Sequence, residues 1–493
     1  MTSLPKKELL RIANSVVKIP DDYELTIEDY LESENAEGEA IFLWTGQKRD
    51  EAISVHLDAQ GNLTYLSIDR QEKEPAAIAM DEVEKRKCAE QFLCTHYPDA
   101  WKDLTFSKTK KLSHADRFYY EQIVMGLPLE HAGCYMDIDP LGEVVTFSSS
   151  YKGVRRIPEI PSTLISKEKL KEHIGHTLQF RLKIHSLHSE VHDVEQGGLY
   201  LVYEPNAVFR KYRAANLCPE TKMSSDEGEG EGETYVPLPT FSLKKVRRDL
   251  GIAEVVGITE NLEMIREVDM GKERGIVWRD RNWQVMEKDL SMDGFFRRQT
   301  EDTVKAFVSK RSGKVRSFIW FMERKGDRQL TREECYTIAI EFLEWVIPEY
   351  FGFLQLTVPK AGDENEEQEN WDDDIDDDIK EAFVFTAHNG HGIPVDSIVT
   401  VTVNRTTGLV DYYNGPDFDS EQLRQLPIKP ALTEERAKEI FMSHLDFELK
   451  WDHNYGEEES DTLVYRLCDV KSRTPIRYID AITGEVRHWK RNP

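Results

Sequence analysis

Three histidines lie close together in the stretch "HSLHSEVH", at the spacing i, i+3 and i+7. They are His185, His188 and His192. On a helix their rings would share one face, where imidazole nitrogens can bind zinc. The corresponding stretch later in the chain, "DHNYGEEESD", has the composition of a surface loop. The competing interpretation is therefore three polar histidines on a loop, which predicts no bound metal and no cofactor.

Catalytic motifs are scarce. Ser149 and Lys152, in "SSYK", have Ser-x-x-Lys spacing, but they follow an expected strand, whereas the catalytic motif opens a helix. The chain contains no His-Glu-x-x-His, Gly-x-Ser-x-Gly or phosphate-binding glycine loop. The sequence thus predicts no catalytic residues. The enzyme hypothesis that stays open is a hydrolase whose site is assembled between two repeated units.

Size and charge narrow the class of protein. The chain has 493 residues, 39% of them hydrophobic, and a formal charge of −27. This length needs several domains, and this charge argues against nucleic-acid partners and anionic membrane surfaces. No apolar run approaches the ~18 residues of a membrane span, and the N-terminus lacks a signal-peptide pattern. Six cysteines without a Cys-x-x-Cys pair favour a reducing compartment, so we expect a cytoplasmic protein.

Self-similarity runs through nearly the whole chain. Residues 3–25 align with residues 242–264 at an offset of 239. Later matches, in the same order, include paired turn glycines: Gly61 with Gly313, Gly126 with Gly392, and Gly142 with Gly408. Chance similarity would not stay collinear over this length. The sequence therefore predicts a tandem duplication, with units at residues 1–218 and 239–493.

Two segments lack the pattern of a packed core. Residues 219–238, between the units, are rich in Glu and Gly, which is typical of a flexible linker. Residues 363–381, in "DENEEQENWDDDIDDDIKE", form an acidic insertion in the second unit. Repulsion between the carboxylates predicts an extended, solvated segment. The alternative is an arm that docks onto a basic partner, with Trp371 among its apolar anchors.

Helical and strand patterns alternate within each unit. Apolar residues recur at helical spacing in residues 3–17 and again after Asp81 and Ser166. Asp81, Ser166 and Thr433 are the expected N-caps. Alternating stretches such as "IVTVTVN", with glycines in the turns, predict antiparallel strands. The predicted fold class is α+β, with helices packed against antiparallel sheets.

The second unit resembles a known repeat family. Its stretches "HGIPVDSIVTVTVNRTTGLVDYYN" and "RYIDAITGEVRHW" are similar to the YcdB/YcdC repeat family of Gram-positive bacteria. The building blocks of that family are similar to PepSY domains, which end in a strand, Asp-Ala-x-Thr-Gly-Glu and another strand. The first unit keeps Tyr212 and Ala215 but lacks the Thr-Gly-Glu turn. The resemblance implies tandem PepSY-like modules and supplies no catalytic residues.

These observations favour a non-enzymatic, soluble protein that binds another protein. The many strand edges expected in such modules can accept an extended segment of a partner. The partner would be a basic protein or a peptidase. Because PepSY domains are associated with peptidase propeptides, the alternative function is that of a peptidase inhibitor or a propeptide-like module.

Overall fold

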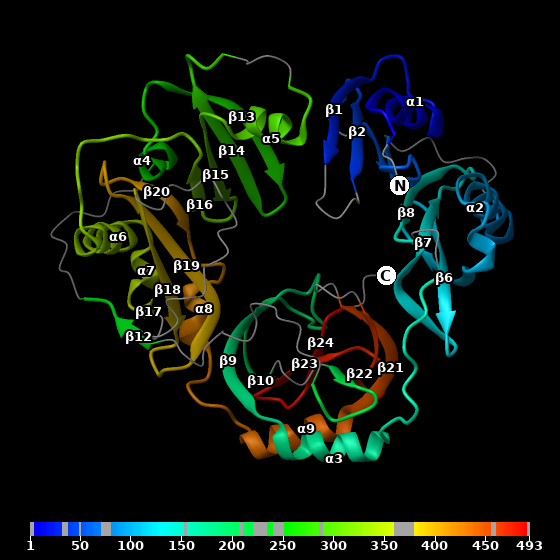
Figure 1. Cartoon of the computed structure of the whole chain (residues 1–493). Coiled ribbons are helices and arrows are strands. Elements are labelled where there is room, and N and C mark those ends of the chain that lie inside the picture. Colours follow the sequence, from blue (N-terminus) through cyan, green and yellow to red (C-terminus); the bar gives the residue numbers. More distant parts are fainter. Residues whose placement is uncertain are drawn as a thin grey trace.

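Three lobes make up the molecule. The computed structural model of the chain describes residues 4–31, 38–48, 51–70, 80–151, 155–206, 211–219, 234–239, 251–284, 289–358, 379–454 and 460–490. Lobe 1 comprises the described residues up to 151, and lobe 2 those between 234 and 426. Lobe 3 comprises the rest, from 155 to 219 and from 427 to 490. Figure 1 shows the lobes in a ring, and each lobe contacts the other two.

Lobe 1 is an eight-stranded antiparallel sheet with helices packed on it. The order across the sheet is β1-β2-β3-β4-β8-β7-β6-β5. Its strands are β1 (Glu24–Leu31), β2 (Glu39–Thr45), β3 (Ala52–Asp58), β4 (Leu63–Asp69), β5 (Thr105–Lys111), β6 (Asp116–Val124), β7 (Leu127–Ile138) and β8 (Val144–Ser149). Its helices are α1 (Lys6–Val16), α2 (Glu82–His96) and η1 (Ala100–Lys102). The expected N-cap of α2 is confirmed, because the Asp81 carboxylate accepts the backbone N–H of Glu84 at 2.8 Å.

Lobe 2 repeats this architecture. Eight of its nine described strands follow the same order, β13-β14-β15-β16-β20-β19-β18-β17, and the ninth, β12, pairs with β17 at the end of this order. The strands are β12 (Thr234–Pro237), β13 (Leu262–Met270), β14 (Glu273–Asp280), β15 (Thr303–Ser309), β16 (Val315–Trp320), β17 (Leu354–Val358), β18 (Lys380–His388), β19 (Pro394–Asn404) and β20 (Val410–Asn414). The helices are α4 (Ile252–Val256), α5 (Met292–Thr300), α6 (Arg332–Val346), α7 (Pro348–Phe351) and α8 (Ser420–Gln425).

Irregularities in the two sheets repeat as well. The β1–β2 ladder shifts register at Thr26, and the β13–β14 ladder shifts at Ile265, which is 239 residues later. The expected turn glycines Gly61, Gly142 and Gly408 have positive φ angles of 85°, 87° and 72°. Glycine adopts this conformation without the steric cost that a Cβ would add. The duplication predicted from the sequence is therefore present in the fold, which is α+β and mostly sheet.

Lobe 3 takes its elements from both predicted units. From the first come α3 (Lys167–Thr177), β9 (Phe180–Leu187), β10 (Gly198–Pro205) and β11 (Lys211–Arg213). From the second come α9 (Glu434–His444), β21 (Leu445–Asn454), β22 (Ser460–Asp469), β23 (Ile476–Asp480) and β24 (Val486–His488). Strand β11 pairs with β22, and β23 pairs with β10. Each unit thus gives its third strand to the other, and α3 packs beside α9.

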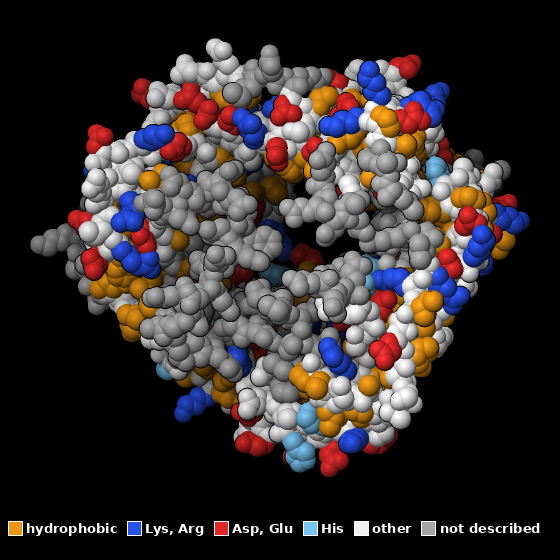
Figure 2. All heavy atoms as spheres, viewed as in Figure 1, with side chains coloured by type: hydrophobic (Ala, Val, Ile, Leu, Met, Phe, Trp, Pro, Cys, Tyr) orange, Lys and Arg blue, Asp and Glu red, His pale blue; other side chains and the backbone are white. Residues whose placement is uncertain are grey.

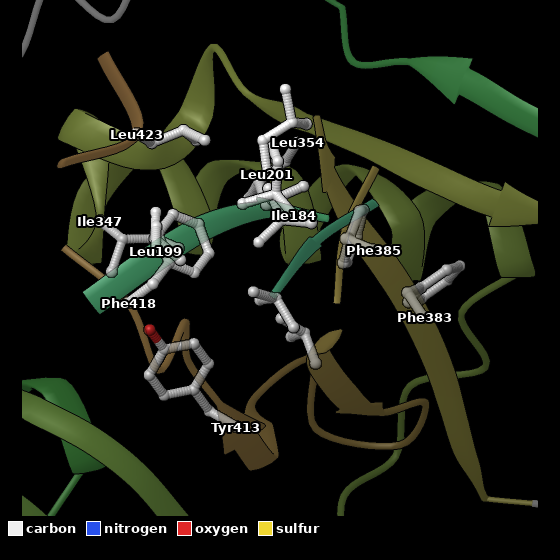
Figure 3. Packing of buried hydrophobic residues seen from close by; sticks show 14 of the residues in the cluster. Ile184, Leu199, Leu201, Ile347, Leu354, Phe383, Phe385, Tyr413, Phe418 and Leu423 are labelled. Atoms are coloured by element: carbon white, nitrogen blue, oxygen red, sulfur yellow. The ribbon is translucent and has the colours of Figure 1, made fainter. Parts of the chain in front are cut away.

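The hydrophobic interior is continuous between lobes 2 and 3. One core lies within lobe 1, whereas a second core extends through both other lobes and includes Leu129 and Ala132 of lobe 1. Figure 3 shows Ile184 and Leu201, from β9 and β10, among Leu354 and Phe385 of lobe 2. A parallel contact between Val395 of β19 and Ile184 joins the two sheets at this place. Burial of this kind is the main favourable term in folding, so lobes 2 and 3 stabilise each other.

Two sequence predictions need correction at their ends. Residues 234–237 of the predicted linker form β12, which pairs with β17, since Tyr235 and Val236 suit an edge strand. Lys380 and Glu381, the last residues of the predicted insertion, begin β18. The remainder of both segments lies outside the described residues, apart from residues 219, 238 and 379. Within the described part of the chain, no helix is long and apolar enough to cross a membrane.

Candidate functional site

The three candidate histidines do not share a helix face. His185 lies in strand β9 and is 5% exposed, whereas His188 and His192 lie in the turn after it. The backbone N–H of His188 donates to Nδ1 of His192 at 3.0 Å. His185 instead turns to lobe 2, where its Nδ1 lies 2.8 Å from Oδ2 of Asp396. Within the described ranges, no group of three or more His, Cys, Asp or Glu side chains is placed to hold a metal ion.

His185 belongs to a charged contact that joins lobes 2 and 3. Its Nε2 lies 3.8 Å from Oε2 of Glu204, and its ring is tilted by 37° against the Tyr478 ring, with 4.4 Å between the ring centroids. Burial by itself lowers the pKa of His185, but Asp396 and Glu204 together raise it above its ordinary value. Burial disfavours the Glu204 carboxylate, yet His185 and Lys183 lower its pKa to about 2. The charged forms of these groups therefore stabilise one another.

The stability of this contact should depend on pH. Since the folded-state pKa of His185 is raised, its contribution is complete below its unfolded value of about 6.5 and is lost as the pH rises through the folded pKa. The lowered pKa values of Asp396 and Glu204 make their contributions complete above about pH 4.5. We expect Asp396→Asn to cost about 1 kcal/mol at pH 6, because Asp396 is half-exposed, and less at pH 8.5.

Melting temperatures at the two pH values test this expectation. The difference between wild-type protein and Asp396→Asn should be larger at pH 6 than at pH 8.5. Asp417→Asn is the matched control, because Asp417 is an exposed carboxylate in the same lobe. Equal differences at both pH values for Asp396→Asn would contradict the assignment of a charged His185.

The other sequence candidate, the Ser149–Lys152 pair, is described only at Ser149. Ser149 ends strand β8, as expected, and its Oγ accepts the backbone N–H of Tyr151 at 3.2 Å. Lys152 lies outside the described residues.

A cluster of polar side chains lies at the contact between lobes 1 and 3, and the sequence analysis did not predict it. Nη1 of Arg156 lies 2.9 Å from Nδ1 of His453, which in turn lies 2.9 Å from Oδ1 of Asp461. Arg156 also donates to the backbone carbonyl of Glu130 in lobe 1. The expected surface loop at "DHNYGEEESD" is thus wrong for its first residues, since Asp452 and His453 are buried in β21. Mutual pairing explains why such polar residues can be buried.

An edge strand of lobe 2 exposes several large apolar side chains. Strand β13 pairs with β14, and no other pairing of β13 occurs within the described ranges. Only Leu262 of its nine residues is buried. Three large apolar side chains are exposed on it: Met264 by 57%, Ile265 by 46% and Met270 by 56%. We call residues 262–270 the β13 edge. Unpaired backbone groups beside exposed apolar side chains can pair with an extended segment.

The equivalent strand of lobe 1 is covered. The N–H of Glu28 in β1 donates to the carbonyl of Leu290 at 2.8 Å, and the Asp29 carboxylate accepts the N–H of Met292 at 2.8 Å. Both acceptor and donor belong to lobe 2, at and just before the start of α5. Of the two equivalent strands, β1 therefore contacts lobe 2, whereas β13 is exposed.

Charged side chains of both signs lie on and beside the β13 edge. It carries Glu263, Glu267 and Asp269 but one cation, Arg266. Arg274 of β14 pairs with Glu267 at 3.0 Å, and Lys310 pairs with Asp269. Figure 2 shows Lys and Arg interspersed with Asp and Glu on the viewed face of all three lobes. The formal charge of −27 belongs to the whole chain, so it would attract a basic segment to the molecule as a whole.

The repeated units of this chain match a family of known proteins. A family model described as the YcdB, YcdC repeated domain matches residues 6–151 and 245–417, which correspond to lobe 1 and most of lobe 2. YcdB of Bacillus subtilis (strain 168) is 31% identical over 486 residues, covering 97% of each chain. YcdC of the same strain is 28% identical over 469 residues, covering 93% of this chain and 96% of its own. The C-terminal domain of YpeB from Bacillus megaterium aligns with a TM-score of 0.28 and 15% identity over 45% of this chain and 97% of that domain.

Proposed function

We propose, from the premise that this chain belongs to the YcdB/YcdC repeated-domain family, that it is a non-enzymatic protein that binds a partner protein at the β13 edge. The occupant is an extended segment that carries basic and apolar side chains in alternation. The observation that carries this proposal is the exposure of Met264 and Ile265 on an edge strand whose repeat equivalent is covered.

The chemistry of the edge defines the partner. Main-chain hydrogen bonds supply affinity for any extended segment, while the side chains on each face select the sequence. Apolar side chains of the partner would cover Met264 and Ile265, and its lysines or arginines would lie near Glu263 and Glu267. Since surface charges mainly raise the rate of encounter, association should slow as salt increases.

Three finer features belong to the same proposal. The order helix, strand, strand and third strand recurs in lobe 3 as α3-β9-β10-β11 and α9-β21-β22-β23. We propose that these two sets are PepSY-like modules. A peptidase is then a candidate partner, because an extended segment of its surface could occupy the β13 edge.

The cytoplasm, predicted from the sequence, is the proposed compartment.

A pair of model peptides tests the binding function. A twelve-residue peptide of alternating lysine and valine should bind the full chain, while a matched peptide of glutamate and valine should not. Fluorescence anisotropy at several salt concentrations gives the affinity. The double variant Met264→Lys with Ile265→Lys should bind the basic peptide at least tenfold more weakly, because it removes apolar contacts and adds like charge.

The control is Ile428→Lys, which changes an equally exposed apolar side chain outside β13. It should bind the basic peptide as the wild type does. If the double variant also binds as the wild type does, the β13 edge is not the binding site. If the acidic peptide binds equally well, the proposed charge selectivity is wrong.

A further inference from the structure

Lobe 3 contains a cavity whose charged lining is entirely basic. The cavity has a volume of about 290 Å³ and lies where β11 and β22 meet β23. Its charged lining residues are Lys211, Lys450, Arg466 and Arg477, and no acidic residue is among the described residues that line it. Such a lining contrasts with the formal charge of −27 over the chain.

The rest of the lining is mainly apolar and well packed. Phe441, Leu445 and Ile476 contribute to it, and each is less than one-tenth exposed. A cavity of roughly 150 Å³ with apolar walls is large enough for benzene, so this one has room for about ten to twelve non-hydrogen atoms. Cations beside an apolar wall suit a ligand with an anionic head and an apolar body.

The guanidinium of Arg466 has hydrogen-bond donors that its contact with Glu448 does not use. Its Nη2 lies 2.5 Å from Oε2 of Glu448. Its Nε is buried, and within the described residues that atom has no hydrogen-bond partner. A guanidinium has five N–H donors in a planar fork that matches a carboxylate. A ligand carboxylate in the cavity could accept from donors of this fork that the contact with Glu448 does not use.

The duplication provides an internal comparison. Strands β9 and β10 correspond to β21 and β22, so Lys183 matches Lys450 and Glu204 matches Arg466. In the first copy, Lys183 and Glu204 form an ion pair at 3.1 Å. In the second copy, the exchange of Glu for Arg leaves two cations at these positions. Each cation pairs with a carboxylate that does not line the cavity, Lys450 with Glu130 at 3.5 Å and Arg466 with Glu448, so the charged groups on the cavity wall are cations alone.

We propose that this cavity binds an amphipathic organic anion, with its carboxylate at Arg466 and its apolar body against Phe441 and Leu445. The site is independent of the β13 edge, which lies in another lobe. The ligand class is an aliphatic or aromatic carboxylic acid of about ten non-hydrogen atoms.

Isothermal titration calorimetry of the full chain with three probes tests this proposal. Octanoate has the expected size and charge, octanol lacks the charge, and octylammonium reverses it. Octanoate should bind at least tenfold more tightly than octanol, and octylammonium more weakly than either. Octanol binding as tightly as octanoate in the wild-type protein would overturn the proposal, whatever happens to the variants.

Variants locate the site. Arg466→Met keeps an apolar stem and should weaken octanoate binding at least tenfold while octanol binding stays the same. Arg466→Lys keeps the charge and should retain most of the affinity. Arg436→Met is the control, because Arg436 is an exposed arginine of α9 that pairs with Glu439. If Arg466→Met melts like the wild type and binds octanoate equally well, the anion does not bind at Arg466.

Discussion

Replacing Trp451 with alanine should lower the free energy of unfolding by about 3–5 kcal/mol. Trp451 lies in β21, is 1% exposed and belongs to the core shared by lobes 2 and 3. Its indole N–H also donates to the backbone carbonyl of Val124 in lobe 1 at 3.1 Å. The substitution therefore leaves a cavity in lobe 3 and an unpaired carbonyl at its contact with lobe 1, and both effects destabilise the protein.

Urea unfolding and thermal melting measure this loss. Trp451→Phe keeps most of the ring but not the N–H, so it should cost less than the alanine variant. Trp345→Ala is the matched control, because Trp345 lies on α6 and is 39% exposed. It should cost about 1 kcal/mol or less. Equal losses for Trp451→Ala and Trp345→Ala would show that the contact between lobes 1 and 3 contributes little.

The duplicated sheets were predictable because their signals are local or repeat along the chain. Asp81, Ser166 and Thr433 each precede a helix and accept a backbone N–H near its start, as their side chains predict. The turn glycines recur because each hairpin needs a positive φ at the same place. The two register shifts, at Thr26 and Ile265, are separated by the same 239 residues as the aligned N-terminal segments of the two units.

The exchange of strands in lobe 3 was not predictable from these signals. Alternation of apolar residues identifies a strand but does not identify its partner. Tyr212 in β11 and Tyr478 in β23 occupy equivalent positions, and both are buried. Either could pair within its own unit as far as the pattern shows. The Thr-Gly-Glu turn is one difference between the units. In the second unit, Gly484 of this turn has a φ of 79° and strand β24 follows it. The first unit lacks the turn, and its third strand, β11, is three residues long.

The exposure of the β13 edge was hidden for a similar reason. Strands β1 and β13 are equivalent in sequence position, so periodicity predicts the same environment for both. The difference comes from α5, which lies in a longer connection between β14 and β15 and packs on β1 of lobe 1. The offset between the copies rises from 239 to 252 across this region. The rise in offset indicates an inserted segment in the second unit. It does not indicate which part of the molecule that segment contacts.

Replacing Asp411 with alanine should destabilise lobe 2 by about 3–5 kcal/mol. Asp411 and Arg324 form an ion pair in which both side chains are almost completely buried. Nε of Arg324 donates to Oδ1 of Asp411 at 2.7 Å, and Asn404 donates to Oδ2 at 3.1 Å. Without the carboxylate, the guanidinium that stacks on Trp320 is left as an uncompensated buried charge. Melting temperature and urea midpoint measure the effect.

A double variant separates the loss of attraction from the cost of an unpaired charge. Arg324→Met with Asp411→Leu removes both charges and keeps apolar volume, so it should recover most of the stability that Asp411→Ala loses. Glu421→Ala, which breaks an exposed ion pair with Arg424 in the same lobe, should cost about 0.5 kcal/mol or less. If the double variant is as unstable as Asp411→Ala, the hydrogen bonds of the carboxylate matter more than the compensation of charge. In that case Asn404, which also donates to the backbone carbonyl of Arg324 at 2.8 Å, would be the residue that loses its acceptor.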